Sequence, residues 1–80
     1  MNIALLLYDR FTALDAVGPY EVLSRLPGAR LQFVALEAGP VRTDNGMLTI
    51  LAEHSIAEVQ APDILVVPGG PGEVAARAGA

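Results

Sequence analysis

Three short apolar runs constrain the fold of this chain more than any other feature. They cover residues 2–8, 30–36 and 63–67, and turns or segments with helical spacing separate them. An uninterrupted apolar run of this length is typical of a strand that is buried on both faces of a parallel sheet. Because helical segments alternate with these strands, we predict an α/β fold whose parallel sheet has covering layers on both faces.

A helical pattern follows the first run. Apolar residues recur at helical spacing over residues 11–26, and the pattern ends at Pro27-Gly28. The residues expected to share one face are Phe11, Leu14, Val17, Val22, Leu23 and Leu26. Pro19 cannot donate to the carbonyl of Asp15, so the helix should either kink there or begin afresh with Gly18 as its cap.

The middle of the chain carries a hairpin signal. Residues 41–43 and 47–51 have the composition of two short β segments. Between them stands Asn45-Gly46, a dipeptide strongly favoured in the tight turns of β-hairpins. We therefore expect a small antiparallel hairpin after the second apolar run.

Two further helical segments are expected beyond the hairpin. Ser55 and Glu58 have the spacing of a capping box, which predicts one or two turns of helix closed by Ala61-Pro62. His54 stands just before this segment, where we expect it to be solvated. Another helix is expected over residues 73–78, after the third apolar run.

These elements make up only part of a domain. Three strands buried on both faces need more covering layers than this chain supplies. We therefore expect residues 1–80 to be the N-terminal part of a longer, single α/β domain. If 80 residues is the natural length, self-association would have to cover the sheet, because exposed apolar patches and an unpaired strand edge invite it.

Composition excludes several classes of function. A net charge of -4 with no lysine argues against nucleic acid or an anionic membrane as a partner. The absence of cysteine removes disulfides and thiolate chemistry from this stretch, and a single histidine excludes an all-histidine metal site, so we predict no metal and no cofactor. The first apolar run is too short for a signal peptide or a bilayer span, which predicts a soluble, cytoplasmic protein.

The glycine-rich segment 68–72 is the first candidate site. It follows the third apolar run, and ligands of open α/β sheets bind just outside the carboxyl ends of the strands. Adjacent glycines let the backbone approach a substrate and aim N–H groups at developing negative charge. The alternative is a tight strand-to-helix turn whose glycines only provide positive φ angles.

The same segment also fits a loose dinucleotide-binding pattern, with Gly70, Gly72 and Ala75 at the required spacing. Three observations weaken that interpretation. The segment follows the third strand and not the first, Pro71 lacks an N–H within the phosphate loop, and no acidic residue stands about 20 positions further on to hold a ribose.

Asp15 is the second candidate, because it lies in an otherwise apolar stretch just before Gly18-Pro19. Its functional interpretation is a proton carrier near the carboxyl edge of the sheet. Its structural interpretation is an N-cap for the helix that runs to Leu26, since aspartate favours that position. Residue type alone favours the cap.

Taken together, the two sites resemble a known family. The segment Leu14-Asp15-x-x-Gly18-Pro19-x-Glu21-Val22, followed by Val67-Pro68-Gly69-Gly70 at this separation, resembles the N-terminal portion of the ThiJ/PfpI (DJ-one) superfamily, and within it the isonitrile hydratase-like branch. The resemblance covers nearly all of the chain. It implies a flavodoxin-like fold of the class I glutamine-amidotransferase type, with helices on both faces of the sheet and only the N-terminal half present.

The resemblance also implies roles for the candidate residues. An acid at the place of Asp15 lies beside a nucleophilic cysteine and handles protons, and Gly69-Gly70 supplies an oxyanion-hole N–H, with Gly70 the better candidate for the donor. The cysteine of the family follows the next strand, beyond residue 80. The family's activity implies a small-molecule substrate, its members are commonly homodimers, and the 80-residue chain alone would be inactive.

Two classes of function remain open. One is a cysteine-dependent lyase that hydrates an isocyanide to an N-substituted formamide. The other is the sensor domain of an AraC-type transcription regulator, which has the same fold and often lacks the cysteine. The Leu14-Asp15 and Gly18-Pro19 pairs occur in both branches, so they favour the enzyme only slightly.

Overall fold

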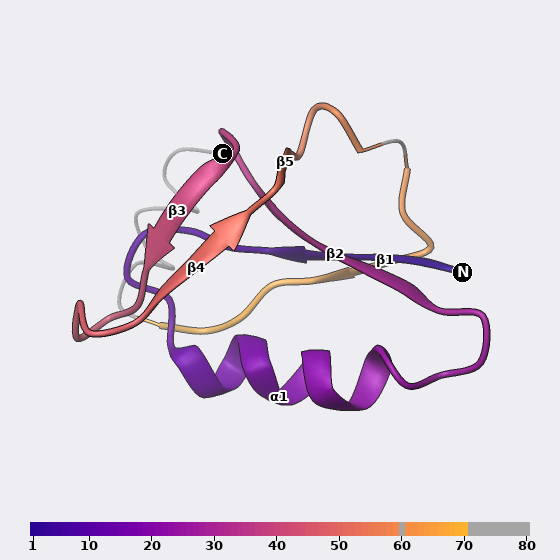
Figure 1. The fold of residues 1–80 in the computed structure, drawn as a ribbon, viewed down its shortest axis with the longest axis horizontal. Coiled ribbons are helices and arrows are strands. Elements are labelled where there is room, and N and C mark those ends of the chain that lie inside the picture. The colour runs from indigo at the N-terminus through magenta and orange to yellow at the C-terminus, as the bar shows by residue number, and fades with distance from the viewer. Residues whose placement is uncertain (60, 71–80) are drawn as a thin grey trace.

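The computed structural model describes residues 1–59 and 61–70. Its elements, in chain order, are β1 (Asn2–Leu6), α1 (Ala13–Leu23), β2 (Arg30–Ala35), β3 (Gly39–Arg42), β4 (Thr49–Ala52), β5 (His54–Ser55) and β6 (Ile64–Val66) (Figure 1). The three apolar runs therefore form strands, as predicted. The helix expected over 73–78 lies outside the described residues.

A four-stranded parallel sheet forms the centre of the fold. Its strand order is β5-β2-β1-β6, so β1 pairs with β2 on one side and with β6 on the other. Each pairing is parallel, and β5 adds a short parallel pairing at the outer edge of β2. The predicted α/β fold class with a parallel sheet is thus confirmed.

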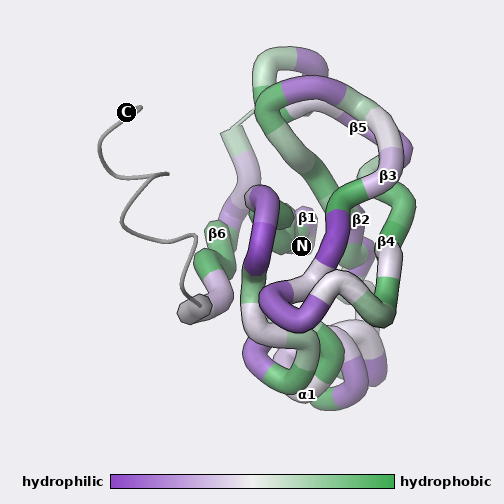
Figure 2. Tube along the Cα trace, turned by 90° about the vertical axis from the view of Figure 1, so that its left-hand side faces the viewer, coloured by the Kyte–Doolittle hydropathy of each residue, from purple (hydrophilic) through white to green (hydrophobic). Residues whose placement is uncertain are grey.

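The two crossover connections pass over opposite faces of this sheet. From β1 the chain reaches β2 through α1, which lies below the sheet in Figure 1, whereas residues 56–59 and 61–63, between β5 and β6, lie above it. The two connections run in opposite directions along the strand order, and right-handed crossovers then place them on opposite faces. Figure 2 shows β6 and the β3–β4 hairpin on opposite sides of β1 and β2.

The core lies where the sheet packs against α1 and the β3–β4 hairpin, because its cluster includes Val41 and Ala52 of the hairpin besides Ala16. Ala16 is the buried residue of α1, and the ring of Tyr20 lies 5.5 Å from that of Phe33 on β2. The buried hydrophobic residues are Ile3, Ala4, Leu5, Leu7, Phe11, Ala16, Val34, Ala35, Val41 and Ala52. On β6, Leu65 is 51% exposed, so burial on both faces was predicted correctly for β1 and incorrectly for β6.

The structure corrects the predicted helix in three ways. The helix spans Ala13–Leu23 and continues through Pro19, with neither a new start nor a cap at Gly18. Glycine tolerates the helical conformation before proline, which a Cβ would disfavour. The expected common face is also wrong, because Leu14 and Val22 are 75% and 67% exposed and only the small Ala16 is buried against the sheet.

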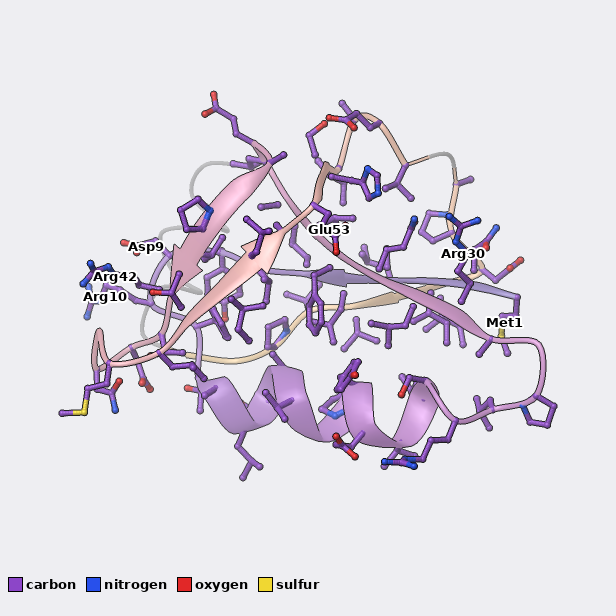
Figure 3. All side chains as sticks on the ribbon, viewed as in Figure 1. Met1, Asp9, Arg10, Arg30, Arg42 and Glu53 are labelled. Atoms are coloured by element: carbon purple, nitrogen blue, oxygen red, sulfur yellow. The ribbon has the colours of Figure 1, made fainter. Side chains whose placement is uncertain are left out.

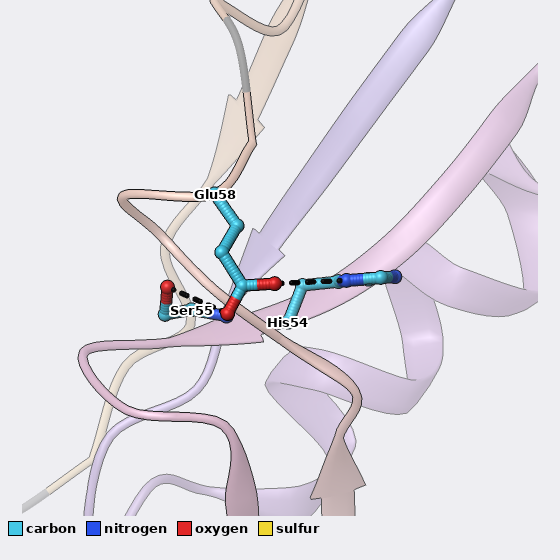
Figure 4. A network of polar contacts seen from close by, with 3 residues as sticks. All are labelled: His54, Ser55 and Glu58. Carbon is cyan, nitrogen blue, oxygen red and sulfur yellow. Dashed lines mark hydrogen bonds and ion pairs between the residues drawn. The ribbon is translucent and has the colours of Figure 1, made fainter.

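The hairpin prediction is confirmed, whereas the helix at the capping box is not. Strands β3 and β4 pair antiparallel, and Gly46 in the connecting turn has φ +72°. Ser55 does donate to Glu58 from its backbone N–H and hydroxyl, but the described residues form a single turn there instead of a helix (Figure 4). His54 belongs to β5 and places Nδ1 3.5 Å from Glu58 Oε2.

The core assignment predicts a contrast between two leucines. Leu5→Ala should lower the free energy of unfolding by about 2–5 kcal/mol, because Leu5 is 0% exposed at the centre of the sheet. Leu14→Ala, on the exposed face of α1, should change it by less than about 0.5 kcal/mol. Urea denaturation of the two variants measures both values, and equal losses would contradict the assigned core.

A second prediction concerns acid stability. The backbone N–H of Ser55, its hydroxyl and then His54 lower the pKa of Glu58. Because the folded-state pKa is depressed, this stabilisation is present above the ordinary glutamate pKa of about 4.3 and is lost as the pH falls through the lower folded value. Glu58→Gln should therefore flatten the decline of unfolding free energy below about pH 5. A decline as steep as that of the wild type in Glu58→Gln would contradict this contribution.

Candidate functional site

The directions of the crossovers mark one place on the sheet as the expected ligand site. The chain leaves β1 over one face and enters β6 over the other, so the strand order reverses between these neighbouring strands. In open α/β sheets, a crevice forms outside the carboxyl ends of the strands at such a switch point. Tyr8 follows β1 and Pro68 follows β6, so both stand at this edge.

Asp15 lies at the same edge, in the first turn of α1. The N-cap of the helix is Thr12, whose carbonyl accepts from the N–H of Asp15 at 3.1 Å. The expectation that Asp15 is the cap is therefore wrong. As an acid in the first turn, its carboxylate still interacts favourably with the positive end of the helix dipole.

The structure brings Asp15 against the glycine turn. A Cβ atom added to Gly69 would lie 2.9 Å from Oδ2 of Asp15, so the carboxylate occupies the space beside the Gly69 backbone. Any side chain at position 69 would displace it. The two candidates that the sequence placed 54 positions apart thus form one site, with a carboxylate facing a backbone turn.

Gly70 is required by close packing as well as by its backbone conformation. It has φ +151°, and an added Cβ would lie 2.7 Å from Thr12 N, 2.8 Å from Arg10 O and 2.9 Å from the Cα of Phe11. These are backbone atoms that cannot rotate away. Gly70 therefore has the positive φ that the structural interpretation of the turn expects, whereas Gly69 does not. The helix that would complete a strand-to-helix turn lies outside the described residues.

Two anchors that sequence analysis missed hold this turn. The hydroxyl of Tyr8 donates to the carbonyl of Pro68, and the N–H of Thr12 donates to the carbonyl of Gly69 at 2.8 Å. The hydroxyl of Thr12 also donates to Asp44 in the hairpin turn, at 3.2 Å. No local pattern signals these contacts, because each joins segments that meet only in the folded chain.

A cleft of about 620 Å³ opens beside this site, at the carboxyl ends of β1 and β2. It is lined by Leu7, Tyr8, Asp9, Ala35, Leu36, Glu37, Pro40, Val41 and Arg42. Asp9 and Arg42 lie at the hairpin end of the molecule in Figure 3. The volume and the mixture of apolar and charged side chains are typical of small-molecule sites, and Tyr8 belongs both to the cleft and to the anchored turn.

The polar cluster of His54, Ser55 and Glu58 is a separate feature (Figure 4). It borders a smaller cleft of about 200 Å³ together with Arg30 and Gln32 of β2. The hydroxyl of Ser55 donates to Glu58 and not to His54, so this is no nucleophile-and-base arrangement. Among residues 1–59 and 61–70, no three histidine, aspartate or glutamate side chains gather closely enough to hold a metal ion.

The sequence and the fold of this chain both match a known family. The family model described as DJ-1/PfpI matches residues 1–78. The chain belongs to the DJ-1/PfpI family, which confirms the resemblance seen in the sequence.

Within the described residues, no helix is both long enough and apolar enough to cross a membrane.

Three individual relatives show how far the similarity extends. An isonitrile hydratase from Pseudomonas putida is 32% identical over 72 residues, which are 90% of this chain and 31% of the relative. The crystal structure of a ThiJ/PfpI family protein from Pseudomonas syringae matches with a TM-score of 0.88 at 34% identity, over 96% of this chain and 32% of that one. An AraC family transcriptional regulator from Pseudomonas putida matches with a TM-score of 0.70 at 25% identity, over 86% of this chain and 46% of that one.

The space around each glycine predicts that alanine is disfavoured at position 70 and tolerated at position 18. Gly70→Ala should cost at least about 2 kcal/mol of unfolding free energy, because its Cβ would overlap three backbone atoms at a positive φ. Gly18→Ala should change stability by less than about 1 kcal/mol, because a Cβ there meets nothing within 4 Å and the gain in helix propensity offsets the restriction before Pro19. Thermal and urea denaturation measure both, and a tolerated Gly70→Ala would disprove the close approach.

Proposed function

We propose that these residues are the N-terminal part of a single-domain isonitrile hydratase-type enzyme, whose nucleophilic cysteine is supplied by chain beyond residue 80. The observation that carries the proposal is the contact of the Asp15 carboxylate with the Gly69 backbone at the switch point of the sheet. The 32% identity to an isonitrile hydratase supports the substrate class. The chain spans about a third of the length of that relative, so the activity of the whole protein is part of this proposal.

The proposed reaction assigns a separate role to each part of the site. The Asp15 carboxylate accepts the proton of the cysteine thiol, and the resulting thiolate adds to the isocyanide carbon. The protonated Asp15 then delivers that proton to the same carbon to give a thioimidate. Water adds to the same carbon, its protons passing to the nitrogen and back to Asp15. Collapse of the tetrahedral intermediate expels the thiolate and releases the N-substituted formamide, while the N–H of Gly70, aided by Gly69, stabilises the developing oxyanion.

A ligand-binding domain of an AraC-type regulator is the second candidate. It is favoured by the structural match to such a regulator. In that case the cleft beside Tyr8 would bind an effector molecule without chemistry. Asp15 and Gly70 would then position the ligand or support the fold.

We further propose that the protein is cytoplasmic and a homodimer. Apolar side chains gather around the hairpin, where Leu36 is 79%, Met47 87% and Leu51 59% exposed. Exposed apolar groups of this size are typical of surfaces that bind another protein. Light scattering that shows a monomer at micromolar concentration would exclude the homodimer.

The proposed role of Asp15 predicts the effect of a single substitution. Asp15→Asn in the complete protein should lower kcat for isocyanide hydration by about 100-fold or more, because the amide cannot carry the proton. Glu21→Gln is the matched control, since this exposed acid of the same helix forms an ion pair with Arg25 at 2.8 Å and lies outside the proposed site. An unchanged rate in Asp15→Asn would remove Asp15 from the chemistry.

The intact mass of the protein from its native host separates the two candidate functions. A single α/β domain with the cysteine predicts about 20–25 kDa. A clearly larger mass would indicate an appended DNA-binding part and favour the regulator. A mass of 8.3 kDa, that of these 80 residues alone, would exclude the enzyme.

A further inference from the structure

The turn after β6 is held by two hydrogen bonds to consecutive carbonyl groups. The Tyr8 hydroxyl donates to the carbonyl of Pro68, which is buried, and the Thr12 N–H donates to that of Gly69 at 2.8 Å. Tyr8 and Pro68 are 60 positions apart in the chain, so the first bond joins the end of β1 directly to the end of β6. The Tyr8 hydroxyl belongs to a side chain and can be removed by substitution, whereas the Thr12 N–H belongs to the backbone.

Because the peptide group is planar, the two hydrogen bonds to carbonyl groups also fix the directions of two N–H groups. In a planar trans peptide, the carbonyl of one residue and the N–H of the next point in opposite directions. No peptide bond among the described residues is cis. The bond from Tyr8 to Pro68 therefore sets the direction of the Gly69 N–H, and the bond from Thr12 to Gly69 sets the direction of the Gly70 N–H.

The part of the chain that the structure describes offers the two N–H groups no acceptor. Within residues 1–59 and 61–70, neither Gly69 N nor Gly70 N donates to a protein acceptor. Glycine at both positions leaves the backbone without Cβ atoms, and the Asp15 carboxylate lies beside Gly69. An oxyanion hole needs N–H donors that are oriented before the reaction, since reorienting them during it costs free energy.

We infer that Tyr8 is a positioning residue, which orients the Gly69 and Gly70 N–H groups by holding the carbonyl of Pro68. Tyr8 does not exchange protons with the substrate in this account. It acts through the peptide between Pro68 and Gly69, and it resists rotation of that peptide when negative charge develops. This inference rests on the proposed function, in which the two N–H groups stabilise an oxyanion.

Tyr8→Phe tests the inference, because it removes the hydroxyl and keeps the ring that lines the cleft. Tyr20→Phe is a matched control, since Tyr20 contacts Phe33 through its ring and its hydroxyl makes no hydrogen bond within the described residues. The complete protein is assayed for hydration of an alkyl isocyanide, with kcat and KM determined separately. Amide NMR spectra of the same variants report the Gly69 and Gly70 N–H groups without any need for activity.

We expect Tyr8→Phe to lower kcat about tenfold, with KM within about twofold of the wild type. The reason is that the less well oriented N–H groups of Gly69 and Gly70 would stabilise the transition state less. The Gly69 and Gly70 amide signals should move, and Tyr20→Phe should change neither kcat nor these signals. An unchanged kcat, or a raised KM with unchanged kcat, would overturn the positioning role. If the wild type hydrates no isocyanide, the proposed function fails, and the amide signals alone then decide whether Tyr8 orients the turn.

Discussion

The parallel pairing of β1 with both β2 and β6 is the interaction on which the rest of the structure depends. It places β1 in the middle of the sheet, where Ile3, Ala4 and Leu5 are each at most 1% exposed. A strand with neighbours on both sides and cover on both faces contributes the largest share of buried apolar area. Its carboxyl end delivers Tyr8 and the loop to α1 at the point where the strand order reverses.

That loop connects the candidate site to the hairpin through backbone bonds. Arg10, with φ 68°, donates its N–H to the carbonyl of Arg42, and Phe11 accepts at its carbonyl from the N–H of Asp44. Thr12 donates to Gly69 on the other side. Since Thr12 is also the N-cap of α1, the same few residues determine where Asp15 stands relative to the glycine turn. The site is therefore a consequence of how one loop packs against two others.

The fold class and the two halves of the site could be predicted from the sequence because both are local signals. Apolar runs mark buried strands, and Asn45-Gly46 marks a turn, whatever the rest of the chain does. The continuous helix through Pro19 and the single turn after Ser55 could not be predicted in the same way. At both places the local pattern, a Gly-Pro pair and a capping-box spacing, favours a conformation that the described residues do not adopt. The contacts of Tyr8 with Pro68 and of Thr12 with Gly69 join segments far apart in sequence. They depend on strand order, which no periodicity reveals.

The central claim is that the carboxylate of Asp15 and the N–H groups of the glycine turn act on one substrate at the β1–β6 edge. A crystal structure of the protein from its native host, with an N-alkylformamide bound, tests this most directly. We expect the formamide oxygen at about 3 Å from the Gly70 N–H, with its formyl group facing Asp15. A formamide bound only in the cleft at the ends of β1 and β2, away from both groups, would contradict it.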